Sequence, residues 1–212
     1  MSGTLQAYQA SVKGILASNG VDPTGLVGAW PWWANSFGDH SGQGNDGTKG
    51  GNPQFVDGAL ELDGDDSVQT PPDAVGATGS VFSWAHTAAL TGDEHIFTHQ
   101  ATHDRVYLKK LNGDEFVLGL GVSANIPTGF EFTIDWHFVG MTWNSGSWVA
   151  RMDGQTSTGS YNGTIDMSLE EWSIGSWKNS NFFWIGKIGS GFVFTRALTA
   201  TETTALHNLG RL

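Results

Sequence analysis

Short runs of strand length recur from Leu26 to the C-terminal end of the chain, and they constrain its fold more than any other feature. The runs are LVGAW, GALEL, VFSWAHTA, EHIFTHQ, RVYLKKL, EFVLGLG, FEFTI, HFVGMTW, SWVARM, EWSIGSW, FFWIGKI and GFVFTRA. Dipeptides that suit tight hairpins separate several of them: Asp57-Gly58, Asp63-Gly64, Asn112-Gly113, Asp153-Gly154 and Asn162-Gly163. Because such turns join antiparallel strands, the sequence predicts an all-β fold, an antiparallel two-sheet sandwich of jelly-roll type.

A short amphipathic helix is expected before the strands, over residues 4–18. Its apolar stripe has helical spacing and consists of Leu5, Tyr8, Val12 and Ile15. Asn19-Gly20 follows as a stop signal. We expect the helix to pack on the domain behind it, because short helices need tertiary contacts. The alternative is that it docks the chain into a larger assembly, in which case removing residues 1–20 would leave the sandwich folded.

A second short helix is expected over residues 199–209, because Thr199 and Glu202 have the spacing of a capping box. No linker or internal repeat interrupts the strands. The expected organisation is therefore an N-terminal helix with its connector, residues 1–23, followed by one jelly-roll domain, residues 24–212.

Composition excludes several classes of function. The chain has 21 acidic and 10 basic residues, a formal charge of -11, which opposes sequence-independent binding to nucleic acid. It has no cysteine, so it forms no disulfide and no thiolate metal site. It shows neither a long apolar run nor a signal peptide, so no membrane partner is expected.

Five segments resemble a known family when they are taken together and in order. They are GLVGAWPWWANSFGDHSGQGNDGT, VDGALELDGDDSVQTP, DWHFVGMTW followed by WVARMDGQ, EEWSIGS, and WIGKIGSGFVFTRALTATETTALHN. Over about residues 24–208 the chain resembles laminin-G-like, concanavalin-A-type jelly-roll domains. The resemblance implies the fold, whereas lectins, adhesins, glycosidases and spacers all share this fold. The tyrosine-containing helix before the first tryptophan strand resembles versions of the domain in phage virion proteins.

The glycine-rich loop Asp39–Thr48 is a candidate calcium loop or a turn. In metal-binding relatives such a loop supplies a carboxylate, and the penultimate strand adds acidic residues where this chain has Gly189 and Ser190. Calcium takes about six to eight oxygen ligands. We therefore favour a turn in which Asp39 and Asn45 bond nearby backbone amides. A calcium site is the less favoured alternative, and its candidate ligands are Asp39, Asp46, Asp63 and Asp66. No other cofactor is expected.

The histidines His95, His99 and His103 recur at every fourth position. On a strand, four residues span about 13 Å, too far for two bonds of about 2 Å to one zinc ion. EHIFTHQ is a predicted strand, so we interpret these residues as ordinary strand positions. We interpret His137, in DWHFVGMTW, as structural.

The ten tryptophans are the most informative candidates for ligand binding. At least half are expected in the core, with Trp30, Trp84, Trp136 and Trp143 as candidates from their positions inside strands. Others lie beside predicted loops, where aromatic faces with neighbouring amides suit sugar binding. The predicted ligand-binding residues are Trp33, Trp177, Asn179 and Asn181.

No catalytic residue is predicted. Glycosidases of this fold use two carboxylates on one strand face, about 5 Å apart. The nearest pair is Glu61 and Asp63, but Gly64 interrupts the strand directly after it. A glycoside hydrolase is therefore the least favoured of three functions.

The favoured function is a noncatalytic virion accessory protein: a head decoration, fibre or tail adhesin that displays a lectin-like domain. Its expected partners are capsid or tail proteins and host-surface glycans, as an oligomer within the assembly. Its expected location is the virion, after synthesis in the host cytoplasm. The alternative is a carbohydrate-binding module of a cellular surface protein, located extracellularly.

Overall fold

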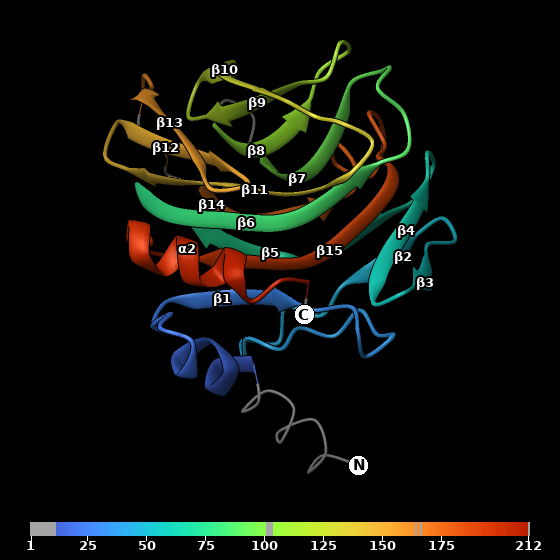
Figure 1. Cartoon of the computed structure of the whole chain (residues 1–212), viewed down its shortest axis with the longest axis horizontal. Coiled ribbons are helices and arrows are strands. Elements are labelled where there is room, and N and C mark those ends of the chain that lie inside the picture. Colours follow the sequence, from blue (N-terminus) through green and yellow to red (C-terminus); the bar gives the residue numbers. More distant parts are fainter. Residues whose placement is uncertain (1–11, 101–103, 164, 166, 212) are drawn as a thin grey trace.

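The chain folds as a sandwich of two antiparallel sheets, as predicted (Figure 1). The computed structural model describes residues 12–100, 104–163, 165 and 167–211. The eight-stranded sheet has the order β13 (Gln155–Ser160), β12 (Ser147–Met152), β11 (Trp136–Asn144), β6 (Thr78–Thr87), β15 (Ile185–Phe194), β4 (Ala59–Asp63) and β3 (Gln54–Val56), with β1 (Leu26–Trp30) also paired to β15. The seven-stranded sheet has the order β10 (Ser123–Glu131), β9 (Glu115–Leu120), β8 (Arg105–Lys110), β7 (Glu94–Gln100), β14 (Met167–Ile174), β5 (Ser67–Val75) and β2 (Thr48–Gly50).

Three of the five predicted turn dipeptides join adjacent strands of one sheet. Asp57-Gly58 joins β3 to β4, Asn112-Gly113 joins β8 to β9, and Asp153-Gly154 joins β12 to β13. The glycines of all three have positive φ, which L-residues with side chains adopt at a cost. The other two dipeptides, Asp63-Gly64 and Asn162-Gly163, lie where the chain passes from the eight-stranded to the seven-stranded sheet. Their hairpin interpretation was wrong, because a glycine turn also serves a crossover between layers.

Several strands differ from those expected from the sequence. The prediction missed β2, β3, β5 and β13, and it divided β15 into two strands. β5 contains Pro71-Pro72, and β13 has the entirely polar sequence QTSTGS. Neither shows an apolar alternation, because β13 forms an edge of its sheet and β5 takes part in pairing with register shifts.

The main core lies between the sheets and contains most of the tryptophans. Six of the ten are buried, as expected for at least half: Trp30, Trp32, Trp143, Trp148, Trp172 and Trp184. Trp84 and Trp136 are only half-buried, so their assignment to the core was wrong. Both stand on the outer face of the eight-stranded sheet, because Phe138 on that face pairs with Trp84, and Trp136 lies two residues before Phe138.

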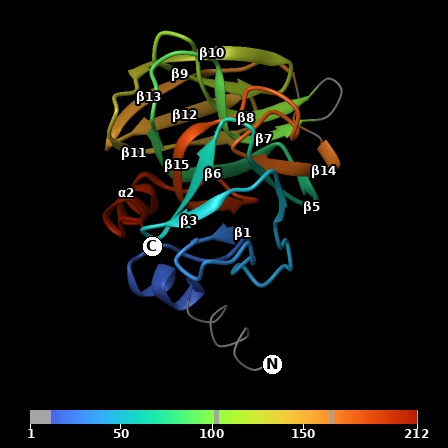
Figure 2. The ribbon, with the colours of Figure 1, turned by 90° about the vertical axis from the view of Figure 1, so that its right-hand side faces the viewer.

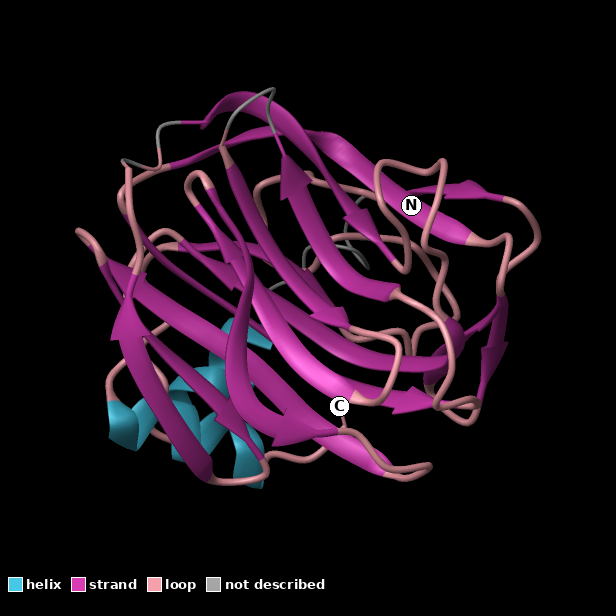
Figure 3. Cartoon of the chain, turned by 90° about the horizontal axis from the view of Figure 1, so that it is seen from above, coloured by secondary structure: helices cyan, strands magenta, loops and turns pink. Residues whose placement is uncertain are grey.

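A second apolar cluster covers the outer face of the eight-stranded sheet. The N-terminal helix is described over residues 12–18, and α2 spans Ala200–Asn208 (Figure 3). Their buried residues pack with Phe82, Phe138 and Phe192 of the sheet. Val12 and Leu16 from the first helix are completely buried there. Residues 12–21 therefore belong to the packed fold, in agreement with the favoured interpretation of the helix; Leu5 and Tyr8 lie outside the described residues.

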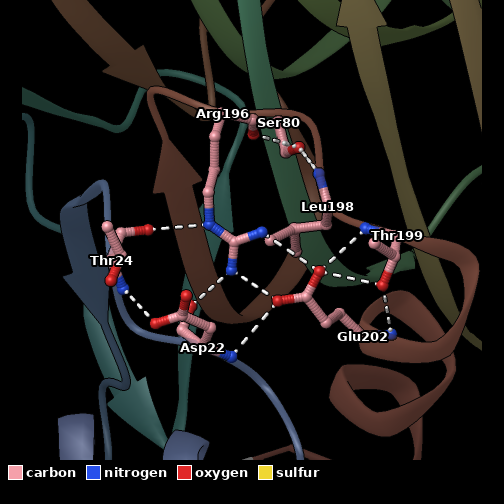
Figure 4. A network of polar contacts seen from close by, with 7 residues as sticks. All are labelled: Asp22, Thr24, Ser80, Arg196, Leu198, Thr199 and Glu202. Carbon is pink, nitrogen blue, oxygen red and sulfur yellow. Dashed lines mark hydrogen bonds and ion pairs between the residues drawn. The ribbon is translucent and has the colours of Figure 1, made fainter.

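Arg196 links the N-terminal connector, at Asp22 and Thr24, to α2 through hydrogen bonds (Figure 4). Its guanidinium donates to both carboxylate oxygens of Glu202 and to the carbonyl oxygens of Asp22 and Thr24. Glu202 also forms the predicted capping box with Thr199, the N-cap of α2. The same carboxylate thus caps the helix and neutralises the arginine. This arrangement lowers the pKa of Glu202 to about 2, chiefly through its hydrogen bond with Arg196.

Candidate ligand-binding surface

The loop after β14 lies on the outer face of the seven-stranded sheet. Along β8, Val106 and Leu108 enter the core between the sheets, so Tyr107 projects to the opposite, outer face. The outer face of β14 presents Ser173, which is paired with Thr98 of β7. After β14, the loop places Trp177 against side chains of β7 and β8 on this face.

The indole of Trp177 packs edge-on against two side chains of the sheet. The ring centroids are 4.9 Å from His95 and 5.8 Å from Tyr107, and both contacts are T-shaped. The hydroxyl group of Tyr107 donates to the Oδ1 atom of Asn125 and accepts from its backbone N–H, so this ring is held at its far end. Trp177 itself stays half-exposed. It therefore presents an aromatic surface to solvent from a rigid support.

His95 acts in this support as a neutral ring. Burial, with a further effect of the positive charge of Lys109, lowers the pKa of His95 to about 3. Its Nδ1 atom lies 2.8 Å from the Thr98 hydroxyl group. At neutral pH the imidazole packs against Trp177 without a charge.

Asn179 anchors the loop to the sheet. Its backbone N–H donates to the hydroxyl groups of Ser173 and Ser176. Its side-chain Oδ1 accepts from Ser67 Oγ, and its Nδ2 donates to Gln69 Oε1 at 3.4 Å. Asn179, one of the predicted ligand-binding residues, thus uses its polar atoms to hold the loop on β5.

The anchored loop has an unusual backbone. Lys178, Asn179 and Phe182 all have φ near +50°, a conformation that residues with side chains seldom adopt. Backbone strain of this kind is found at functional sites, where the surrounding structure holds it in place. Trp177 and Asn181 form an isolated bridge that closes the loop.

The exposed side chains next to Trp177 offer both polar and apolar contacts. Asn181 is exposed, and its amide has only a weak contact of 3.4 Å with Ser180 Oγ. Phe182 is 47% exposed, and the Lys109 ammonium group lies 5.2 Å from its ring centroid. Trp177, Asn181 and Phe182 thus form a small surface, which we call the Trp177 surface.

Trp33 does not belong to the Trp177 surface. It packs on the helix-covered cluster, and its ring centroid lies 5.6 Å from that of His40. The N-terminal helix and β8–β10 lie at opposite ends of the views in Figures 1 and 2. The four predicted ligand-binding residues therefore do not share one surface, because Trp33 lies apart from Trp177, Asn179 and Asn181.

Asp39 and Asp46 organise the glycine-rich loop between β1 and β2. Asp39 is buried, and its two oxygens accept four donors, which are Ala29 N–H, Ser41 N–H, Ser41 O–H and Asn45 N–H. Asp46 accepts the backbone N–H of Asp39 at 2.8 Å. These bonds are the turn geometry that the sequence favours for this loop.

Asp63 and Asp66 lie apart from that loop, with Asp65 between them. The three carboxylates offer oxygens that lie within 4.8 Å of one another. Among the described residues, no other group of three or more acidic or histidine side chains is as closely spaced. A hydrogen bond with Asp63 and the charge of that residue raise the pKa of Asp65. The four predicted calcium ligands therefore divide between two places. The group adjoins the Trp177 loop through Ser67, which donates to Asn179.

The histidine positions on β7 agree with a strand. His95 faces outward against Trp177, whereas His99 packs against Trp172 in the core. A register shift between His95 and Phe97 accounts for this change of face. His103 lies outside the described residues.

His137 has partners that sequence reasoning missed. Its Nδ1 atom lies 2.5 Å from Asp153 Oδ2, and its Nε2 accepts the backbone N–H of Thr133 at 3.1 Å. Asp153 also accepts the N–H of Phe138. The Asp153-Gly154 dipeptide marks this position in the sequence, but nothing in the spacing assigns the contact. His137 ties the start of β11 to the β12–β13 turn.

Of three comparisons with known proteins, the one with solved structures finds similar folds. No protein-family model matches the chain, and a search of curated proteins finds no match. The fourth domain of AbnA, an extracellular GH43 arabinanase from Geobacillus stearothermophilus solved with arabinotriose, has a TM-score of 0.74 at 18% identity over 85% of this chain and 97% of that domain. Trypanosoma rangeli sialidase in complex with sialic acid has a TM-score of 0.73 at 17% identity, over 96% of this chain.

The binding domain of botulinum neurotoxin DC, solved with rat synaptotagmin II, has a TM-score of 0.69 at 16% identity over 87% of this chain. The chain spans only 37% of the sialidase and 51% of the toxin structure. At such identities these structures establish the β-sandwich fold of this chain, whereas its activity has to be argued from the geometry of the site. No helix in the described part of the chain has the length and apolar character needed to cross a membrane.

Proposed function

We propose that this chain is a noncatalytic carbohydrate-binding β-sandwich whose ligand stacks on Trp177. The observation that carries the proposal is the half-exposed indole held edge-on by His95 and Tyr107 on an anchored loop. A preorganised aromatic face loses little conformational freedom when a sugar ring packs on it. Asn181 supplies an amide for sugar hydroxyl groups beside that face.

The fold supports this proposal by analogy. Structures with the same architecture include an arabinanase domain with arabinotriose and a sialidase with sialic acid. Neither likeness assigns a ligand to this chain, so the proposal rests on the Trp177 surface.

A glycoside hydrolase is a second candidate, favoured by the short separation of Asp63 and Asp65. Retaining glycosidases place two carboxylates about 5 Å apart, one of them with a raised pKa. Oxygens of Asp63 and Asp65 lie within 4.8 Å of each other, and a hydrogen bond between the two carboxyl groups raises the pKa of Asp65. Both side chains are exposed on a turn, where water competes for a substrate, so binding without cleavage is the better-supported function.

We propose further that the domain is displayed on a virion as a decoration, fibre or tail adhesin. The resemblance of its helix and first strand to phage virion proteins supports this placement. A carbohydrate-binding module of a cellular surface protein is the alternative with the same site. Mass spectrometry of purified virions distinguishes the two: detection of the chain supports the virion placement, and its recovery only from host cell surfaces contradicts it.

The binding function is tested on a glycan array followed by calorimetric titration. Trp177→Ala is expected to weaken binding of the strongest glycan by about 1–3 kcal/mol, or roughly 5- to 150-fold. Val122→Ala is the matched control, because it removes an exposed apolar side chain elsewhere and should leave binding unchanged. Equal affinities of the folded Trp177 variant and the wild type would contradict the site. Glycan cleavage that Asp65→Asn or Glu61→Gln abolishes would establish the hydrolase instead.

A further inference from the structure

A row of side chains crosses the outer face of the eight-stranded sheet beside α2. The strand register places Trp136 opposite His86, His86 opposite Lys187, and Lys187 opposite Glu61. Directly opposed residues share one face of a sheet, so these four side chains project together. All four are half-exposed. The helices thus leave this part of the sheet accessible.

Arg211 stacks on Trp136 at the end of this row. The guanidinium carbon lies 4.1 Å from the centroid of the indole ring. Gly189 of β15 makes room below them: a Cβ atom there would lie 2.8 Å from Trp84 Cβ and 3.5 Å from both Arg211 and Trp136. A glycine at this position lets three large side chains converge over the strand. Stacking restrains the guanidinium, and Arg211 as a whole is exposed.

The charges in this row do not cancel at Arg211. Lys187 lies 3.7 Å from Glu61 and 4.0 Å from Asp57, so its charge is compensated. Arg211 forms no ion pair with any acidic residue in the described ranges. Among the described residues, Arg211 is therefore an exposed arginine that is stacked on an indole and has no acidic side chain as a partner.

We infer that this surface binds a carboxylate-bearing sugar, with Arg211 as the carboxylate ligand. The fork of a guanidinium matches a carboxylate bidentately. Half-exposed Trp84 and Trp136 offer apolar contacts for the sugar ring. His86, Lys187 and Glu61 offer hydrogen bonds to hydroxyl groups along the row. This site lies on the other sheet from Trp177, so the inference does not depend on the proposed binding of a glycan at Trp177.

The inference is tested by calorimetric titration of the full chain with two acidic probes and their neutral counterparts. 3′-Sialyllactose is compared with lactose, and trigalacturonate with galactotriose. The two pairs show whether the site prefers a sialic acid or a uronic acid. At least one acidic sugar should bind more tightly than its neutral counterpart. Arg211→Gln should weaken that binding by about 10- to 100-fold, the loss expected for charge-assisted hydrogen bonds. Arg211→Lys should lose part of the affinity, because an ammonium group keeps the charge without the fork.

Two variants serve as matched controls. Arg151→Gln removes the same charge from the same sheet face, and Val122→Ala removes an exposed apolar side chain from the β9–β10 turn of the other sheet. Both should bind the acidic sugar as the wild type does. The inference is contradicted if neither acidic sugar binds more tightly than its neutral counterpart, or if Arg151→Gln weakens binding as much as Arg211→Gln. Melting temperatures of all variants show that they are folded.

Discussion

Tyr107 supports Trp177 because the residue opposite it in β9 has no side chain. Gly119 pairs with Tyr107, and a Cβ atom at residue 119 would clash with the tyrosine ring. Gly119→Ala should therefore displace Tyr107 and lower the free energy of unfolding by about 1–3 kcal/mol, the usual cost of overpacking. Thermal denaturation measures this change. Gly76→Ala is the control, because a Cβ atom there meets no atom within 4 Å; equal melting temperatures of both variants would contradict the packing account.

The acidic side chains give a prediction about calcium. Asp39 already accepts four hydrogen bonds, and the remaining group of Asp63, Asp65 and Asp66 supplies few ligands for an ion that needs about six to eight. Millimolar calcium should therefore change the melting temperature little, since a ligand stabilises in proportion to its occupancy. An increase of about 5 °C or more, roughly 1–3 kcal/mol for a domain of this size, would establish a calcium site.

The N-terminal helix is a structural element of the sandwich. Leu16 is completely buried against the outer face of the eight-stranded sheet, whereas Ile15 of the same helix is half-exposed. Leu16→Ala should lower the free energy of unfolding by about 2–5 kcal/mol, and Ile15→Ala by clearly less. Chemical denaturation compares the two variants. A fully stable chain after removal of residues 1–20 would instead favour a helix that serves only for docking.

The contact between α2 and the N-terminal connector depends on pH. The pKa of Glu202 is lowered to about 2 from its ordinary value of 4.5, so the unfolded chain takes up a proton first as the pH falls. The stabilisation by Glu202 is thus present above about pH 4.5 and is lost progressively toward pH 2. Glu202→Gln should lower stability at pH 7 and flatten the decline below pH 4.5, as followed by melting temperature. Glu131→Gln, at an exposed position, should keep the wild-type profile.

At the scale of the whole molecule, the sequence predicts the architecture better than the site. Strand-length runs and glycine turns specify two antiparallel sheets, and the Thr199–Glu202 spacing specifies the cap of α2. β13 is not predicted from the sequence, because an edge strand can pair with its neighbour through backbone hydrogen bonds without apolar side chains. The support of Trp177 depends on His95 and Tyr107, which are 82 and 70 residues away in the sequence. Only the register of β7, β8 and β14 brings these side chains together.

The central claim, that a glycan stacks on Trp177, is tested most directly by the ten indole N–H resonances of the nitrogen-labelled chain. Six tryptophans are buried and four are half-exposed. The indole resonance that shifts when a ligand is added therefore shows which tryptophan the ligand contacts. Addition of the strongest glycan from the array should shift the Trp177 resonance in proportion to occupancy. The resonances of the buried Trp30 and Trp143 should stay in place. Saturation of the chain with that glycan while the Trp177 resonance stays unchanged would contradict the account.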